Sequence, residues 1–140
     1  MSVEVNWIAV FLATVSAMVV GFVWYAPNVF GNAWMRLAGL EDPAKRKKGM
    51  FGAMAASVLG SLLTAYVLAH VAFMAHYFYK NSFFMDSVTT AFWLALGFTF
   101  TTLIIHNSFE QKPWKLTALA VGNRFVTLVA MGMVIGLLKP

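Results

Sequence analysis

The chain has 140 residues, of which 61% are apolar and only 11% are charged. A soluble domain carries about 25% charged residues, so this chain has too few of them to cover a water-facing surface. It has no cysteine, which excludes disulfides, thiol redox chemistry and cysteine-ligated metal sites. Most of the net charge of +5 comes from two short loops, a pattern that suits an anionic membrane surface better than nucleic acid.

Four apolar segments follow one another along the chain, and each reaches the roughly 20 residues needed to cross a bilayer. Because a backbone in lipid must satisfy its own hydrogen bonds, these segments are expected to be helices. The predicted helices cover residues 6–25, 43–79, 84–108 and 115–138 of a single transmembrane domain, residues 1–140. The first segment lacks a basic n-region and carries Glu4, which favours a mature helix over a signal peptide.

The connection between the first two helices reads YAPNVFGNAWMRLAGLEDPAKRKKG. Pro27 and Gly31 are expected to end the first helix. Phe30, Trp34 and Leu37 follow at positions i, i+4 and i+7, which is one face of a helix. This spacing predicts a short amphipathic helix that lies in the membrane interface.

Asp42 followed by Pro43 is an N-cap signal, so the second long helix is predicted to begin near Pro43 and to carry KRKK on its first turns. Asp86 is expected to cap the third helix in the same way. The remaining connections are short, so consecutive helices are predicted to be antiparallel neighbours. The fold class is therefore an all-α integral membrane protein, an antiparallel bundle of four transmembrane helices with a short interfacial helix between helices one and two.

Lysine and arginine are distributed unevenly between the two sides of this bundle. One side holds Arg36, Lys45, Arg46, Lys47, Lys48, Lys112 and Lys115, whereas the other holds Lys80 and Lys139. Cytoplasmic loops carry the excess of positive residues. The bias predicts that both termini lie outside and that the long basic loop lies in the cytoplasm.

Rows of small residues predict close packing of helices, since such residues let backbones approach each other in lipid. The rows are Ala9, Ala13, Ala17 and Gly21; Gly52, Ala56 and Gly60; Ala53, Ser57 and Ser61; and the GxxxG pair Gly132 and Gly136. Four helices offer limited partner surface, so two outcomes stay open. Either every row packs within one chain, or surplus rows hold a homo-oligomer together.

Polar side chains collect near the cytoplasmic end of the predicted third and fourth helices. The third helix carries a stripe that leads through His106 to Glu110, with Asn107 beside it. The fourth helix carries Asn123 and Arg124 on a comparable face, and Tyr25 ends the first helix on the same side. The candidate ligand-binding residues are therefore Arg124, Asn107, Glu110, His106, Asn123 and Tyr25.

Arg124 admits three interpretations, and the sequence leaves all three open. Its long side chain can snorkel to the cytoplasmic interface. It can pair with Glu110 or with the Asn107 carbonyl as a packing lock. It can also line a polar cavity that binds an anionic small molecule or a lipid headgroup, which is the default functional interpretation of a charge inside the membrane.

The other polar residues do not form a recognisable catalytic or metal site. A lone interfacial histidine such as His106 is typically a hydrogen-bonding residue. His70 and His76 fall toward the opposite side of the membrane, so the three histidines are not expected to share a metal ion. There is no HExxH spacing and no glycine-rich phosphate loop after a strand. We expect no catalytic residue, metal or cofactor.

Two stretches, WYAPNVFGNAWMRLAGL after the first helix and NSFEQKPWKLTALAVGN across the third connection, resemble a bacterial four-helix membrane family known as domain of unknown function 1761. The elements that carry the resemblance are Trp24, Tyr25, Pro27, Phe30, Gly31, Trp34, Phe109, Glu110, Lys112 and Pro113. It spans nearly the whole chain and implies four transmembrane helices in the bacterial cytoplasmic (inner) membrane. It implies no established activity, so no catalytic residue is transferred. Members often have a small or aromatic residue where this chain has Arg124.

Three classes of function remain. The first is a homo-oligomeric binding or transport-type protein with a polar site at Arg124. The second is a structural or accessory subunit whose small-residue rows dock onto a larger membrane complex. The third is a membrane enzyme acting on a lipid or quinone, for which only Glu110 and His106 qualify as acid and base. We favour the first class narrowly over the second. The sequence does not reveal the ligand, any direction of transport, the oligomer number or the physiological partner.

Overall fold

The computed structural model describes residues 2–140, and over that range it consists of helices and connections without a strand. Four helical spans are long and apolar enough to cross a membrane. They are α1 (Trp7–Trp24), α4 (Met50–Tyr79), the combined span Phe83–Phe109 and α7 (Trp114–Leu138). The third span comprises α5 (Phe83–Leu94), a π-helical segment η2 (Ala95–Phe100) and α6 (Thr101–Phe109).

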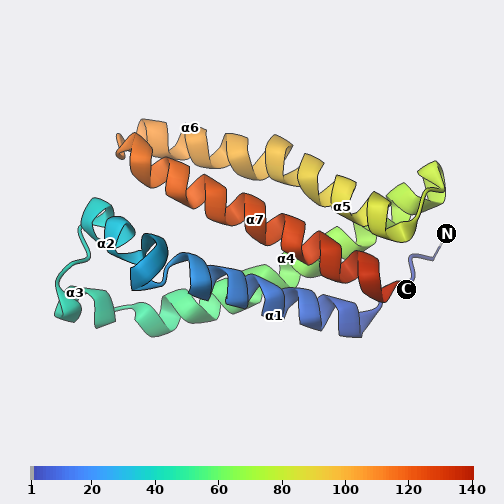
Figure 1. Ribbon diagram of the computed structural model, residues 1–140, viewed down its shortest axis with the longest axis horizontal. Coiled ribbons are helices and arrows are strands. Elements are labelled where there is room, and N and C mark those ends of the chain that lie inside the picture. Colours follow the sequence, from blue (N-terminus) through green and yellow to red (C-terminus); the bar gives the residue numbers. More distant parts are fainter. Residues whose placement is uncertain (1) are drawn as a thin grey trace.

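The two ends of the molecule differ in character. Both termini and the α4–α5 connection lie at one end, here called the terminal end, whereas α2 (Asn32–Ala38), α3 (Pro43–Lys47) and the α6–α7 connection lie at the other (Figure 1). We call the second end the basic end, because it carries Arg36, Lys45, Arg46, Lys47, Lys48, Lys112 and Lys115.

At the terminal end, one side chain joins the start of α1 to the end of α7. The Asn6 side-chain oxygen accepts hydrogen bonds from the backbone N–H groups of Ile8 and Ala9, which caps α1. Its amide nitrogen donates to the carbonyl oxygens of Leu138 and Lys139, at 3.0 and 2.8 Å. The four bonds therefore fix the relative position of the two helices at this end.

The chain turns back on itself directly after α1. A π-helical turn, η1 (Pro27–Gly31), leads into α2, and Gly31 packs against the end of α1. A Cβ atom on Gly31 would lie 2.2 Å from the Tyr25 carbonyl oxygen, so only glycine fits there. The Tyr25 and Trp34 rings then meet at 5.3 Å between centroids, which holds α2 against the end of α1.

The second helix does not run unbroken from residue 43 to residue 79, and that prediction is wrong. Asp42 caps α3 through a hydrogen bond from the Ala44 backbone, as expected, but α3 ends at Lys47. Lys48 is extended and Gly49 has a φ of +91°, a conformation that glycine adopts without strain. Four consecutive positive side chains repel one another, and Gly49 lets the chain change direction before α4 begins at Met50.

The core lies in the terminal half of the bundle, where α7 packs between α1 and α5 (Figure 1). Many of its residues are alanines, which allow the helix backbones to approach closely. The core includes Ala9, Ala13, Ala17, Ala65, Leu68, Ala91, Leu128, Met131 and Ile135. The GxxxG pair also packs inside the chain: a Cβ on Gly132 would lie 2.6 Å from Ala91 Cβ, and one on Gly136 would lie 2.8 Å from Phe84 Cα.

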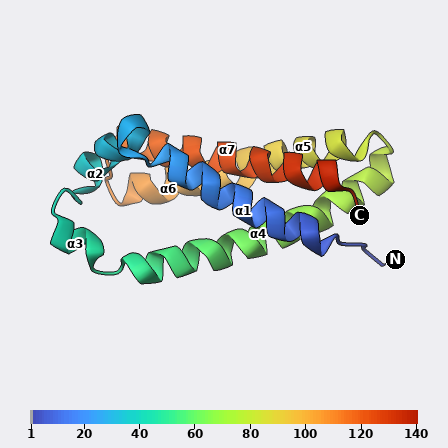
Figure 2. The same ribbon diagram turned by 60° about the horizontal axis from the view of Figure 1, so that its bottom comes forward.

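The first half of α4 is not part of this core. Every residue from 47 to 60 is exposed, whereas Ser61, Ala65 and Leu68 further along α4 are buried. Figure 2 shows this half of α4 running apart from α1, α6 and α7 at the basic end. A Cβ on Gly52 or Gly60 would meet nothing within 4 Å. The three alanines of the α1 row and the GxxxG pair of α7 thus pack within the chain, and the small residues of the first half of α4 do not.

Candidate functional site

Arg124 lies on the face of α7 that the core occupies further along the helix. Leu128, Met131 and Ile135 follow it by four, seven and eleven residues, which places all four on one helical face. These three apolar side chains are buried, with 7%, 1% and 2% of their surface exposed. Arg124 is exposed, because the first half of α4 gives no cover at this level. The arginine is therefore on the core-facing row at the point where the core ends.

Within residues 2–140, the Arg124 guanidinium has no hydrogen bond or ion pair with another protein group. The contacts that the packing-lock interpretation requires, from Arg124 to Glu110 or to the Asn107 carbonyl, are not present. Among the predicted ligand-binding residues, Tyr25, just beyond the end of α1, is close enough to Arg124 for the arginine charge to affect its pKa. Burial raises the pKa of the Tyr25 hydroxyl, and the nearby positive charge of Arg124 opposes that rise. Arg124 and Tyr25 therefore belong to one electrostatic neighbourhood.

Two further donors, one on the residue before Arg124 and one at the end of α1, lack acceptors in the described part of the chain. Asn123 is buried, and its amide nitrogen has no hydrogen-bond partner. The indole N–H of Trp24 is also buried without a partner, and the Trp24 ring lies against Gly122, where a Cβ would be 2.9 Å from it. Buried polar groups are normally satisfied. Asn123 and Arg124 thus carry donors, and Gly122 contacts one, for which residues 2–140 supply no acceptor.

The other three predicted site residues form a separate group at the α6–α7 connection. Asn107 is buried and donates to the Thr117 hydroxyl at 3.1 Å, which ties α6 to α7. Thr117 precedes Arg124 by seven residues, or about 10 Å along the helix. The structure therefore groups Arg124 with Asn123 and Tyr25, and it places Asn107 nearer the basic end.

Glu110 is already paired within its own connection. One carboxylate oxygen lies 3.2 Å from His106 Nε2 and the other contacts the Lys112 ammonium. The hydrogen bond from Lys112 holds the pKa of Glu110 below its usual range. Desolvation opposes this lowering, and the neighbouring charges of His106 and Lys112 add to it. All three side chains are exposed, so this pair faces solvent or headgroups rather than the bundle interior.

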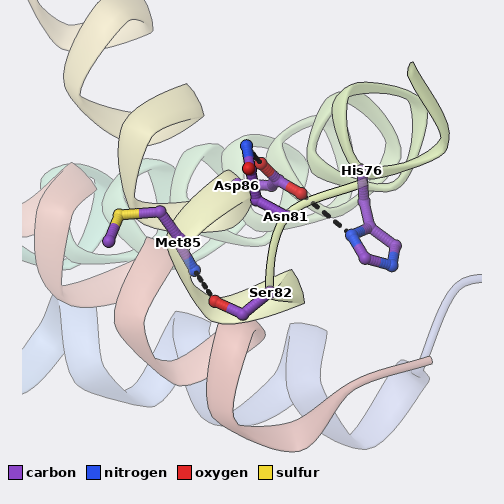
Figure 3. Close-up of polar contacts among 5 residues, drawn as sticks. All are labelled: His76, Asn81, Ser82, Met85 and Asp86. Atoms are coloured by element: carbon purple, nitrogen blue, oxygen red, sulfur yellow. Dashed lines mark hydrogen bonds and ion pairs between the residues drawn. The ribbon is translucent and has the colours of Figure 1, made fainter. Parts of the chain in front are cut away.

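A polar cluster at the terminal end was not predicted from the sequence. The Asp86 side chain, only 3% exposed, pairs with His76 Nδ1 at 2.9 Å. Its other oxygen accepts a hydrogen bond from the Asn81 amide at 3.0 Å. Figure 3 shows the three side chains converging from the end of α4, the connection and the first turns of α5. The cluster joins two helices across their turn.

The predicted capping role of Asp86 is wrong. Ser82 caps α5 instead, because its hydroxyl accepts from the Met85 backbone N–H at 3.2 Å and it directly precedes the first helical residue (Figure 3). Asp86 lies one turn later and faces α4. The sequence contained an indication of this pair. His76 lies in the last turn of one helix and Asp86 lies in the first turns of the next, and a short connection brings two such positions together.

Asp86 also lines a cavity of about 410 Å³. Asn81, Thr89 and Thr90 contribute polar side chains to its wall, and Tyr79 and Trp93 contribute aromatic ones. No group of three or more His, Asp or Glu residues placed to hold a metal ion occurs within the described range 2–140. The cavity therefore combines a buried carboxylate, several oxygen acceptors and aromatic surface without a metal-ligand set.

The fold and these sites define a small all-helical protein with four helices able to cross a membrane and few ionisable groups within them. The family model described as "Protein of unknown function (DUF1761)" matches residues 8–136, and the chain belongs to that family. Comparison with curated proteins and with solved structures finds no match.

Proposed function

We propose that the protein binds a phosphate- or carboxylate-bearing molecule at Arg124 and acts as a homo-oligomeric binding or transport-type membrane protein. The observation that carries this proposal is that Arg124, on the core-facing row of α7, has no acceptor among the described residues and adjoins the buried, unpaired amide of Asn123. A set of donors without acceptors is complementary to an anionic oxygen ligand.

The chemistry of arginine suits this role. Its planar guanidinium binds phosphate or carboxylate through two parallel hydrogen bonds, which lysine does not reproduce. Insertion scales put an arginine at mid-bilayer at about +2.5 to +3.5 kcal/mol. A charge-assisted hydrogen bond contributes about 1.5 to 3 kcal/mol, so one bound anion offsets most of that cost. An occupied site is thus more favourable than an empty one.

In the membrane, we propose an antiparallel bundle with both termini outside and α2 in the interface at the cytoplasmic side of the bacterial inner membrane. Arg124 follows the start of α7 by ten residues, which is about 15 Å along the helix. At this depth Arg124 would lie inside the hydrocarbon, deeper in the membrane than the charged residues of the basic end. A ligand would reach it from the cytoplasm, where the basic end attracts anions.

In this proposal, a second copy of the chain packs against the exposed first half of α4. The first half of α4 is exposed and contains Gly52, Ala56 and Gly60, which permit a close helix contact. The same face favours a competing function, that of an accessory subunit docked on a different membrane protein. A homo-oligomer in mild detergent supports the first function, whereas a monomer that loses no ligand on Arg124 substitution supports the second.

The binding proposal is tested with nanodiscs of phosphatidylglycerol or of phosphatidylcholine, and with inorganic phosphate. We expect Arg124→Gln to lose at least tenfold in retention of the anionic partner and Arg124→Lys to lose less. Loss confined to the phosphatidylglycerol arm identifies a headgroup, and loss confined to the phosphate arm identifies a free anion. Lys47→Gln removes one charge from the same end as a matched control. Equal losses in Arg124→Gln and Lys47→Gln would contradict a site.

A further inference from the structure

The terminal end holds a buried carboxylate next to an open cavity, and this arrangement has no role in the anion site. Asp86 is 3% exposed, with His76 on one oxygen and Asn81 on the other (Figure 3). We propose that the cavity beside Asp86 binds a small organic cation, an ammonium group on an apolar body, in competition with a proton on His76.

The first step concerns charge. A buried carboxylate is costly unless a positive group compensates it. His76 is the basic side chain in contact with Asp86, and it compensates the charge only when both of its ring nitrogens carry protons. A neutral His76 still donates a hydrogen bond but leaves the pair with a net negative charge. Asp86 therefore attracts either a proton to His76 or a cation to the cavity.

The second step concerns the cavity wall. Two of the roughly four lone-pair positions of the Asp86 carboxylate are used by His76 and Asn81, so acceptor capacity remains. The Asn81 carbonyl oxygen and the hydroxyls of Thr89 and Thr90 add neutral acceptors. An ammonium group donates up to three hydrogen bonds and needs such a set.

The third step concerns the body of the ligand. Trp93 and Tyr79 line the same cavity, and aromatic faces attract cations. A volume of about 410 Å³ exceeds what a bare metal ion needs and falls in the range of small-molecule sites. The absence of a three-residue ligand set within residues 2–140 agrees with an organic cation rather than a metal.

The protonation equilibrium involves few other groups. His76 is partly exposed, with 39% of its side chain accessible, so it exchanges protons with water at the end of the bundle. The Phe83 ring packs edge-on against it at 5.4 Å. The other titratable side chains around the cluster are Tyr79 in the cavity wall, Lys80 in the connection, and Glu4 and Lys139 beside Phe83. His70 packs against Tyr66 instead.

Competition fixes the sign of the pH dependence. A proton on His76 neutralises Asp86, so protonation weakens cation binding, and bound cation in turn disfavours protonation. If one proton leaves His76 for each cation that binds, the affinity for the cation falls up to tenfold for each unit by which the pH is lowered. Histidine side chains ordinarily titrate between pH 5 and 8. Binding is therefore tightest at the alkaline end of that range.

The experiment is calorimetric titration of the full chain in an uncharged detergent with phenethylammonium, and with the neutral analogue 2-phenylethanol as a matched probe. We expect only the cation to bind at pH 8, and to bind at least tenfold more weakly at pH 5.5. Asp86→Asn should lose at least tenfold in affinity at pH 8, whereas Glu4→Gln, which removes an exposed carboxylate at the same end, should leave it unchanged.

A second variant covers the case in which Asp86→Asn does not fold. Trp93→Leu leaves the His76–Asp86–Asn81 hydrogen bonds in place and should weaken cation binding severalfold. Equal binding of the two probes, an affinity that does not change with pH, or an affinity unaltered in Trp93→Leu would each overturn the proposal. The cluster would then serve only to join α4 to α5. None of these results bears on anion retention at Arg124.

Discussion

Gly132 of α7 packs so closely on Ala91 of α5 that a Cβ atom at position 132 would lie 2.6 Å from the Ala91 Cβ and 3.0 Å from the Ser87 carbonyl oxygen. Real Cβ atoms do not approach that closely, so the contact requires glycine. Ala91 is fully buried, so a side chain added at position 132 would meet packed atoms rather than open space. This contact sets the distance between α5 and α7. The GxxxG pair therefore packs helices within one chain rather than between two chains.

Gly132→Leu should therefore destabilise the folded chain rather than its assembly. Overpacking a tight core costs about 1–3 kcal/mol or more, because neighbouring side chains and backbone must shift. The measurement is unfolding of the detergent-solubilised protein by a denaturant titration, followed by circular dichroism. Gly21→Leu is the matched control, since a Cβ there meets nothing within 4 Å. Equal stability of the two variants would contradict the packing argument.

Gly60→Leu tests the proposed homo-oligomer. Gly60 lies on the exposed half of α4, so a larger side chain meets nothing within the chain and should leave its stability nearly unchanged. In an assembly packed through this face, the same change blocks close approach of the second copy. We expect the mass in mild detergent to shift toward the monomer. A monomeric mass for the unmodified protein in several mild detergents would rule out this interface.

Arg124→Gln should raise the pKa of Tyr25. Burial already raises that pKa and the charge of Arg124 opposes the rise, so removing the charge removes the opposing effect. A raised folded-state pKa means that stability is full below the unfolded value and falls as the pH rises toward the folded one. Ultraviolet difference titration reads the change, with Tyr25→Phe identifying the signal. An unchanged pKa of Tyr25 in Arg124→Gln would show that the arginine charge does not act on the tyrosine.

Lys112→Gln should raise the pKa of Glu110, because the hydrogen bond from Lys112 is the main cause of its lowered value. For a carboxyl with a depressed folded pKa, the favourable interaction is present above the unfolded pKa and disappears as the pH falls through the folded one. Carbon-13 NMR of labelled glutamate follows this titration directly. His106→Gln should shift the same pKa less, and a larger shift from His106 than from Lys112 would reverse the assignment.

The proposed orientation is tested with single cysteines, since the natural chain contains none. Cysteine at Ser2 or Ser82 should react with an impermeant thiol reagent in intact cells, because both belong to the side proposed to lie outside. Cysteine at Lys47 or Gln111 should be protected until the cells are opened. Labelling of Lys47→Cys together with protection of Ser2→Cys would invert the topology.

Local rules in the sequence were sufficient for the helices themselves. Hydropathy and length predicted the four long spans to within a residue or two at most ends, because membrane helices are determined by their own composition. Asp42 was correctly predicted as a cap, since capping depends on neighbours in the chain. The break between α3 and α4 was missed, because it depends on an extended Lys48 and a positive φ at Gly49, which periodicity does not reveal.

Whether a small or charged residue faces a partner was decided by the tertiary structure alone. Similar rows of small residues in α4 and α7 pack differently, because α4 diverges from the bundle at the basic end whereas α7 stays between its neighbours. The same divergence leaves Arg124 exposed on a core-facing row. The His76–Asp86 pair likewise depends on how two helices meet across a turn. Composition determines which segments enter the membrane, but contacts between segments depend on crossing geometry, which no single segment encodes.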